Sequence, residues 1–258
     1  MARNIESTVD ALKYLMEYAE EAHERWDADD EMKVGKMLLA MSGRLPMYDA
    51  GIDQITELVK SSLSAIGCIN NTIKTFGGLY FDLANPTPEQ VELKTIVATL
   101  SRLVRFGGHS PGFYTVAEHC VKMTRLARRQ HRTDSFQRYC LLHDASEAYT
   151  IDLPKPLKIM IPDYSLIESR VMLAIVDKFG LNVSDLPGVK ALDLVMLKSE
   201  RHAMWPEDDT LWTGFTTVEI DEGFFPEYWE PHQAADEFLD ECSILGLDEF
   251  VDCSKIPF

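Results

Sequence analysis

Apolar residues recur three and four positions apart along most of this chain of 258 residues, a spacing that gathers them on one face of an α-helix. Val9, Leu12, Leu15, Met16 and Ala19 show the pattern clearly. We therefore predict an all-α fold. Helices are expected over residues 7–24, 30–41, 50–66, 88–101, 113–131, 134–149, 165–179, 187–205 and 232–245.

Local signals mark where several of these helices begin and end. The run Thr87-Pro-Glu-Gln90 has the pattern of a capping box with proline at the first helical position, and it opens the fourth helix. Gly180 and Gly246 are placed to close the helices that precede them. The Gly-rich passage 75–86 is predicted to be loop with a little strand.

Neither a membrane segment nor a disulfide framework is predicted. No apolar run approaches the roughly 20 residues that a membrane-spanning helix needs, and the first residues lack the apolar stretch of a signal peptide. The cysteines are widely spaced without a CxxC pair, which favours buried thiols over disulfides or a zinc knuckle; they are Cys68, Cys120, Cys140, Cys242 and Cys253. These observations predict a cytoplasmic protein with no membrane partner.

The charge of the chain is strongly negative but uneven. A formal net charge of −17 argues against a nucleic-acid polymer as partner, because such binding needs a basic surface. Residues 94–158 nevertheless hold 11 Lys and Arg against 5 Asp and Glu. A local positive field in an acidic protein suits a small polyanion.

The adjacent pair His143-Asp144 carries the strongest chemical signal. Both residues are poor helix formers and neither suits an apolar face, so their place inside a predicted helix indicates that they bind something. His119 lies on the preceding predicted helix and Asp193 on a later one. Two imidazoles and two carboxylates from three helices would form a site for one divalent metal ion. Glu147 is one turn beyond His143 and reaches the same side of the helix.

Each of these residues has a simpler explanation when it is taken alone. His119 could be a core histidine whose hydrogen bonds are satisfied, and Asp193 could be a solvated residue or an ion-pair partner. Glu200 and Arg201 are best interpreted as a structural ion pair that supports the helix of Asp193. The metal site therefore depends on the order and context of the residues together.

The order His, His-Asp, Asp on successive helices resembles the HD-domain superfamily of metal-dependent phosphohydrolases. The similarity is greatest to its compact branch, which includes YfbR-type 5′-deoxynucleotidases and phage DatZ-type dATP triphosphohydrolases. It covers about residues 75–205. The motifs that carry it are Arg105-Phe-Gly-Gly-His109, Tyr114-Thr-Val-Ala-Glu-His119, Leu141-Leu-His-Asp-Ala-Ser-Glu147-Ala-Tyr149, Asp152-Leu-Pro-Lys-Pro-Leu-Lys158, Asp193 and Glu200-Arg201.

The resemblance implies the metal ligands. They would be His119, His143, Asp144 and Asp193. A mixed set of imidazoles and carboxylates suits one divalent transition metal (Mn, Co, Zn, Fe or Ni) better than Mg, although Mg could accompany a triphosphate. Four protein ligands on a six-coordinate ion would leave positions for water and for a phosphate oxygen.

The resemblance also implies the residues that act on the substrate. Glu147 corresponds to the acid or base that follows the His-Asp pair. Arg105 corresponds to the arginine that contacts phosphate, so it would serve both catalysis and substrate binding. His109 and Lys158 would bind the substrate as well, although either could instead be an ordinary loop or surface residue.

Three functions follow from the resemblance. The preferred one is a deoxynucleoside triphosphate triphosphohydrolase that releases a deoxynucleoside and tripolyphosphate, with dATP as the preferred substrate. The first alternative is a 5′-deoxynucleotidase that hydrolyses deoxynucleoside monophosphates. The second is a non-catalytic HD scaffold that senses nucleotides. In each case the partner is a deoxynucleotide.

The expected domains are an N-terminal helical extension over residues 1–70 and an HD phosphohydrolase domain over residues 71–258. Within the second, residues 206–230 should form an irregular segment packed on the helices and followed by a final helix. The resemblance further implies a homo-oligomer, in the host cytoplasm if the chain is phage-encoded.

Overall fold

The computed structural model describes residues 71–206 and 218–247. By its internal contacts the chain divides into two compact units, Met1–Asn71 and Thr72–Phe258. The three helices predicted within the first 70 residues lie outside the described residues. The assignment of residues 71–258 to one phosphohydrolase domain stays a prediction.

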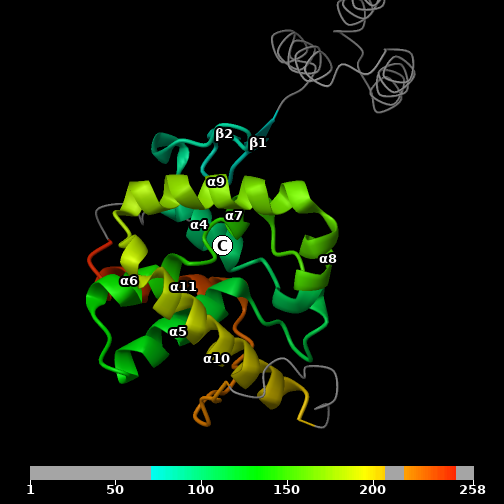
Figure 1. Cartoon of the computed structure of the whole chain (residues 1–258), viewed down its shortest axis with the longest axis vertical. Coiled ribbons are helices and arrows are strands. Elements are labelled where there is room, and N and C mark those ends of the chain that lie inside the picture. The colour runs from blue at the N-terminus through cyan, green and yellow to red at the C-terminus, as the bar shows by residue number, and fades with distance from the viewer. Residues whose placement is uncertain (1–70, 207–217, 248–258) are drawn as a thin grey trace, which may run out of the picture. The chain divides into compact units, whose positions relative to one another are not determined.

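Most of the described residues are helical, which confirms the all-α class in outline (Figure 1). A small antiparallel hairpin comes first, with β1 (Thr72–Lys74) paired to β2 (Tyr80–Asp82), as the prediction of a little strand in this passage allowed. The α-helices that follow are α4 (Leu93–Leu100), α5 (Val116–Arg129), α6 (Asp134–Leu142), α7 (Glu147–Thr150), α8 (Lys155–Met160), α9 (Pro162–Phe179), α10 (Leu186–Met204) and α11 (Pro231–Ile244). Short 3-10 turns are η1 (Pro88–Gln90), η2 (Arg105–Gly108) and η3 (Val183–Asp185).

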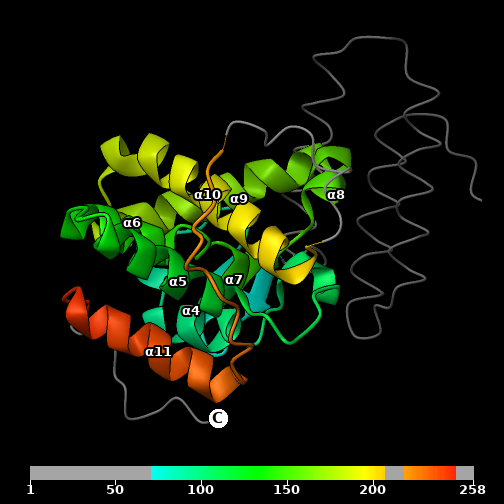
Figure 2. The same ribbon diagram turned by 90° about the horizontal axis from the view of Figure 1, so that it is seen from below.

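Helix α5 lies at the centre of this arrangement and packs against α4, α6, α10 and α11 (Figure 2). Thr115 begins it by accepting a hydrogen bond from the Glu118 N–H at 3.0 Å. Nearly every position from Val116 to Ala127 is buried, including Glu118 and His119. Charged and titratable residues on a buried helix must find partners, so α5 is where the polar chemistry of the fold is concentrated.

The helix predicted over 134–149 is broken at the His-Asp pair. Helix α6 ends at Leu142, and the chain makes a tight turn before α7, with backbone hydrogen bonds from residue i to i+3. His143 Nδ1 contacts the Cys140 carbonyl at 2.8 Å and so competes for an acceptor that a continuous helix would use. The pair therefore occupies a turn between two helices, and the prediction that it lies within one helix is wrong.

The helix predicted over 88–101 is also interrupted. The turn η1 is followed by Val91 and Glu92 in extended conformation, and α4 begins only at Leu93. The extended backbone buries Val91 and lets the Glu92 N–H donate to the Tyr149 hydroxyl at 3.2 Å. Tertiary contacts thus override the local helix signal.

The remaining helices lie close to their predicted positions. Helices α9, α10 and α11 match the predicted elements within a few residues, and α5 is shorter than its predicted range of 113–131. Gly180 and Gly246 adopt left-handed conformations with φ of 59° and 68°, as expected of glycines that end helices. Helix α8 was not predicted, because the prolines around it favour irregular chain. No helix within the described ranges is long and apolar enough to cross a membrane.

The described part of the irregular segment, residues 218–230, is fastened to α5. The buried Glu118 carboxylate accepts hydrogen bonds from the backbone N–H groups of Glu227 at 2.7 Å, Tyr228 at 3.3 Å and Trp229 at 3.0 Å. The Trp229 side chain is buried. This passage is irregular and packed on the helices, as predicted, and it covers α5 beside the candidate site.

Candidate metal centre

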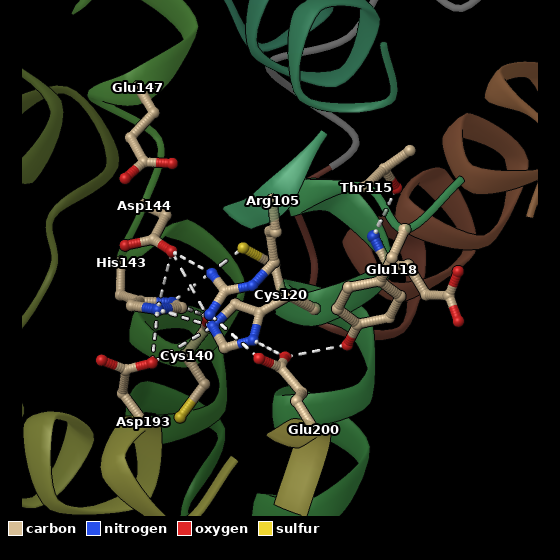
Figure 3. A network of polar contacts seen from close by, with 12 residues as sticks. Arg105, Thr115, Glu118, Cys120, Cys140, His143, Asp144, Glu147, Asp193 and Glu200 are labelled. Atoms are coloured by element: carbon tan, nitrogen blue, oxygen red, sulfur yellow. Dashed lines mark hydrogen bonds and ion pairs between the residues drawn. The ribbon is translucent and has the colours of Figure 1, made fainter. Parts of the chain in front are cut away.

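Four side chains from three parts of the fold direct their ligand atoms toward one another (Figure 3). His119 comes from α5, His143 and Asp144 from the turn before α7, and Asp193 from α10. His119 Nε2 lies 3.2 Å from His143 Nε2, 3.3 Å from Asp193 Oδ1 and 3.8 Å from Asp144 Oδ2. His143 Nε2 lies 3.3 Å from Asp144 Oδ2 and 3.7 Å from Asp193 Oδ1. The structure brings together all four residues predicted as ligands.

These separations fit a shared metal ion. Two ligand atoms that are each about 2.1 Å from one ion, at right angles or in tetrahedral arrangement, lie about 3.0–3.4 Å apart. The ligand atoms of His119, His143 and Asp193 all lie within 4.8 Å of one another, and Asp144 adjoins them. Two imidazole nitrogens and two carboxylate oxygens are donors that a divalent ion accepts.

A second possible group is formed by Cys120, His143 and Asp144. In this group the Cys120 sulfur lies 4.0 Å from His143 Nδ1, but that nitrogen already contacts the Cys140 carbonyl at 2.8 Å. Burial also raises the pKa of the Cys120 thiol, which disfavours the thiolate that binds metals. The set with both Nε2 atoms is therefore the better candidate.

Both histidines are anchored through the nitrogen that faces away from the cluster. His143 Nδ1 donates to the Cys140 carbonyl, and His119 Nδ1 lies 2.5 Å from a carboxylate oxygen of Glu200. A proton held on Nδ1 leaves the Nε2 lone pair directed at the cluster. Metal-binding histidines in proteins are usually held in this way.

Without a metal ion, protons on the two histidines balance part of the negative charge of the cluster. Burial lowers the pKa of the His143 imidazole, but the adjacent Asp144 carboxylate more than offsets this and the net shift is upward. The pKa of Asp144 falls to about 2 because the imidazolium outweighs the effect of burial, and that of Asp193 falls well below its ordinary range for the same reason. Binding of a metal ion would release these protons.

Arg105 lies between two carboxylates of the site. Its Nη1 is 3.4 Å from Asp144 Oδ2, and its Nη2 is 3.1 Å from Glu200 Oε2. The guanidinium is buried, and Nε has no hydrogen-bond partner. The predicted contact with phosphate stays a prediction; what the structure adds is that Arg105 bridges acidic groups around the cluster.

Glu147 begins α7, one turn beyond the His-Asp pair, and lies past Asp144 on the side away from Glu200 in Figure 3. The side chain is buried, and Oε2 has no hydrogen-bond partner. Burial, and then the carboxylates of Asp144 and Asp152, raise the pKa of Glu147 well above its ordinary value. These effects favour the protonated form of the Glu147 carboxyl group.

Lys158, on α8, lies beside Glu147. Its ammonium lies 2.7 Å from Glu168 Oε1 and 3.4 Å from Glu147 Oε1. Glu147 and Glu168 both raise the pKa of Lys158, and Glu168 makes the shorter contact. The structure thus places Lys158 beside the candidate acid.

His109 follows the turn η2 and is exposed. Phe106, Gly107 and Gly108 all have left-handed backbone conformations, with φ of 57°, 61° and 79°, which glycine adopts without strain. A Cβ atom added to Gly107 would lie 3.6 Å from a Pro154 side-chain carbon. The loop therefore borders the segment before α8, and a role for His109 in substrate binding stays a prediction.

Sequence reasoning missed three residues around the cluster. Glu200 was interpreted as the partner of Arg201, yet its buried carboxylate contacts His119, Arg105 and the Tyr114 hydroxyl. The seven-residue spacing from Asp193 placed both acids on one helix face and was the available signal. Tyr114 carried no signal beyond being aromatic. Asp152 was quoted as part of a motif without a role, and burial raises its pKa beside Asp144 and Arg105.

Several of the basic side chains in residues 94–158 form ion pairs within the protein. Arg125 and Arg128 pair with Glu241 of α11 at 2.8 and 2.6 Å, and Arg129 pairs with Asp221. These contacts lie on the side of α5 that faces the C-terminal segment. The positive charge of this region therefore supports the substrate side less than the sequence suggested.

Two known proteins are similar in sequence to more than half of the chain. No family model matches the sequence. The chain is 35% identical to the uncharacterized protein YfdR of Escherichia coli (strain K12) over 174 residues, which cover 67% of this chain and 95% of YfdR. It is 29% identical over 161 residues to an uncharacterized protein of Rhodobacter capsulatus, covering 58% of this chain and 78% of that protein. The chain therefore belongs to the same family as YfdR.

Proposed function

We propose that the chain is a metal-dependent phosphohydrolase of the HD-domain type that acts on deoxynucleotides. The observation that carries the proposal is the convergence of His119, His143, Asp144 and Asp193 through Nε2 and carboxylate oxygens, at separations of 3.2–3.8 Å. The order of these residues in the sequence is the order of the superfamily motif. The anchored Nδ1 atoms support a ligand role over a packing role.

The donor set suits one divalent transition ion such as Mn, Fe, Co, Ni or Zn. When bound, such an ion would supply Lewis-acid polarisation of a phosphoryl oxygen and would lower the pKa of a coordinated solvent molecule. His119, His143 and the two aspartates would hold it, and Arg105 would stabilise the charge of Asp144 from outside. The remaining chemistry must come from groups next to the cluster.

Glu147 is suited to act as a general acid. Its Oε2 is buried without a hydrogen-bond partner, and its raised pKa favours the protonated form of the carboxyl group. A protonated carboxyl beside the cluster can donate that proton to the oxygen of a leaving group as the phosphoester bond breaks. Buried polar atoms usually have partners, and the one missing here would be supplied by the substrate.

The positive groups near Glu147 are arranged to receive phosphate oxygens. Lys158 carries its charge beside Glu147, and its side chain is 23% exposed. Arg105 has an unpartnered Nε, and the left-handed loop that leads to His109 borders the same segment. These groups would neutralise charge on the non-bridging oxygens of the substrate.

We propose a deoxynucleoside triphosphate, dATP in particular, as the substrate, in line with the resemblance to the triphosphohydrolases of the compact branch. One observation favours the alternative of a 5′-deoxynucleotidase. Arg125, Arg128 and Arg129 are paired with acidic residues, so fewer cations are free for a long phosphate chain than the sequence indicated. A homo-oligomer stays a prediction.

A product analysis tests these proposals. Metal-stripped protein is incubated with each dNTP and each dNMP, with Mn²⁺, Co²⁺, Zn²⁺ or Mg²⁺ added back, and the products are resolved by chromatography. We expect tripolyphosphate and deoxyadenosine from dATP. Orthophosphate released from monophosphates alone would establish the 5′-deoxynucleotidase instead. No turnover with any metal would contradict an enzymatic function and would leave the nucleotide-sensing scaffold.

A further inference from the structure

Glu200 is a fully buried carboxylate, with an exposed fraction of 0%, and it stands directly behind the metal cluster. It lies on α10 seven residues after Asp193, so one helix supplies both a candidate ligand and a carboxylate outside the ligand set. Its Oε1 accepts hydrogen bonds from His119 Nδ1 at 2.5 Å and from the Tyr114 hydroxyl at 2.8 Å. Its Oε2 accepts from Arg105 Nη2 at 3.1 Å.

These contacts leave little freedom to the carboxylate or to the ring it holds. A buried carboxylate is costly unless it is compensated, and here a guanidinium and a hydroxyl provide the compensation. The three donors around Glu200, one of them a guanidinium, hold its carboxylate as a hydrogen-bond acceptor in a fixed position.

We propose that Glu200, held by Tyr114 and Arg105, is a positioning residue that fixes the tautomer and orientation of His119 and thereby sets the metal affinity of the site. This inference rests on the proposed metal-dependent function. With the proton kept on Nδ1, His119 presents Nε2 to the cluster. A charged acceptor at Nδ1 makes the Nε2 atom a stronger metal ligand. Glu200 itself is not one of the candidate ligands.

The second histidine provides an internal comparison. His143 Nδ1 is held by the Cys140 backbone carbonyl, a neutral acceptor that no side-chain substitution removes. His119 depends on one side chain, and that side chain is also tied through Arg105 to Asp144 on the opposite side of the cluster. Loss of Glu200 would therefore disturb His119 directly and Asp144 indirectly, while His143 keeps its anchor.

The test compares metal binding by the full chain and its Glu200→Gln variant, with Co²⁺ or Mn²⁺ titrated into metal-stripped protein in a calorimeter. The amide keeps the shape but loses the charge, and we expect metal affinity to fall by about 10–100-fold. Tyr114→Phe removes one hydrogen bond and leaves the carboxylate, so it should weaken binding by less than about tenfold. Glu241→Gln is the matched control, because it also removes a buried carboxylate paired with arginine but lies on the α11 side; its metal affinity should equal that of the wild type.

A second readout does not depend on the metal. In ¹⁵N-labelled metal-stripped protein, at a pH high enough for the His119 ring to be neutral, the ring signals should show the Nδ1-protonated pattern in the wild type and in Glu241→Gln and should shift away from it in Glu200→Gln. If Glu200→Gln does not fold, Tyr114→Phe and Glu200→Asp carry the same comparison. A wild type that binds metal together with folded Glu200 variants of unchanged affinity and unchanged ring signals would overturn the inference and leave the proposed function standing. A wild type that binds none of the metals would overturn the proposed function.

Discussion

Helix α5 borders two ionic clusters, each with a buried carboxylate, whose charges are balanced in different ways. Toward α11, Glu241 is buried between Arg125 and Arg128, with contacts of 2.8 and 2.6 Å, so two permanent cations attend the acid. Toward α10, three carboxylates converge on two imidazoles and one guanidinium; they are those of Asp144, Asp193 and Glu200. The first cluster is electrically complete with its own side chains, and the second is not.

The difference distinguishes an ion network that holds helices together from one prepared for a ligand. Fixed guanidinium groups neutralise Glu241 at any ordinary pH, and nothing further is needed there. In the metal cluster the balance depends on protons carried by His119 and His143, and protons are exchangeable for a divalent cation. Two buried polar atoms without a hydrogen-bond partner, Arg105 Nε and Glu147 Oε2, belong to residues beside this cluster. Carboxylates that have too few arginine or lysine partners thus indicate the site better than the number of charged residues does.

The strongest test of this contrast is Asp144→Ala. The substitution removes a carboxylate that lies 3.3 Å from His143 Nε2, so we expect metal binding and phosphohydrolase activity to be lost altogether. Calorimetric titration with Co²⁺ and product analysis with dATP measure the two effects. Glu241→Gln, on the other side of α5, should retain both. Full activity in Asp144→Ala would show that the cluster is not a catalytic metal site.

Glu147→Gln should separate metal binding from turnover. The glutamine keeps the size of the side chain but cannot donate a carboxyl proton, so we expect unchanged metal affinity and a decrease of about 10²–10⁴-fold in kcat. In the wild type kcat should also decline on the basic side as Glu147 loses its proton. Steady-state rates over pH 5–9 check both expectations. Equal losses of metal affinity and turnover would instead assign Glu147 a structural role.

The sequence was sufficient for what depends on local patterns and residue order. The periodicity of α5 and α10 and the glycines at 180 and 246 predicted helices with their ends, because these signals act within a few residues. The ligand set followed from the order of histidines and aspartates. In both cases the information lies in neighbouring positions or in a motif.

Contacts between distant segments could not be predicted in the same way. His119 and Glu200 are 81 residues apart, and the helix face that Glu200 shares with Asp193 does not indicate which side chain it contacts. The helix break at His143 arises because its ring binds the Cys140 carbonyl while Nε2 faces groups on other helices. The pairing of Arg125 and Arg128 with α11 likewise turned a basic stretch of sequence into an internal ion network.

The α11 side can be tested directly through Glu241→Gln. Removing the charge leaves Arg125 and Arg128 without their buried anion, although both are 35% exposed and can be partly rehydrated. We therefore expect the free energy of unfolding to fall by about 1–3 kcal/mol, while the metal affinity stays unchanged. Urea denaturation of metal-stripped protein measures the first quantity. An unchanged stability together with weakened metal binding would erase the distinction between the two sides of α5.

The smallest expected effect is that of Glu168→Gln, which tests how strongly Lys158 influences the pKa of Glu147. Glu168 holds Lys158 at 2.7 Å, whereas Glu147 lies at 3.4 Å from the same ammonium. Without the nearer acid, the lysine charge acts more fully on Glu147 and stabilises its ionised form, so the raised pKa of Glu147 should fall. Because Glu147 acts as an acid in the proposed reaction, the basic limb of the kcat profile should move to lower pH, by up to about one unit.

The matched control is Glu237→Gln, which removes an acid of similar exposure from an ion pair with Arg125 on the α11 side. Its pH profile should coincide with that of the wild type, since the lost charge lies behind α5 and away from Glu147. A limb that stays in place in Glu168→Gln, or that moves to higher pH, would contradict the acid role of Glu147. It would also mean that the Lys158 ammonium does not influence the protonation of Glu147, because Glu168→Gln removes only the closer partner of that ammonium.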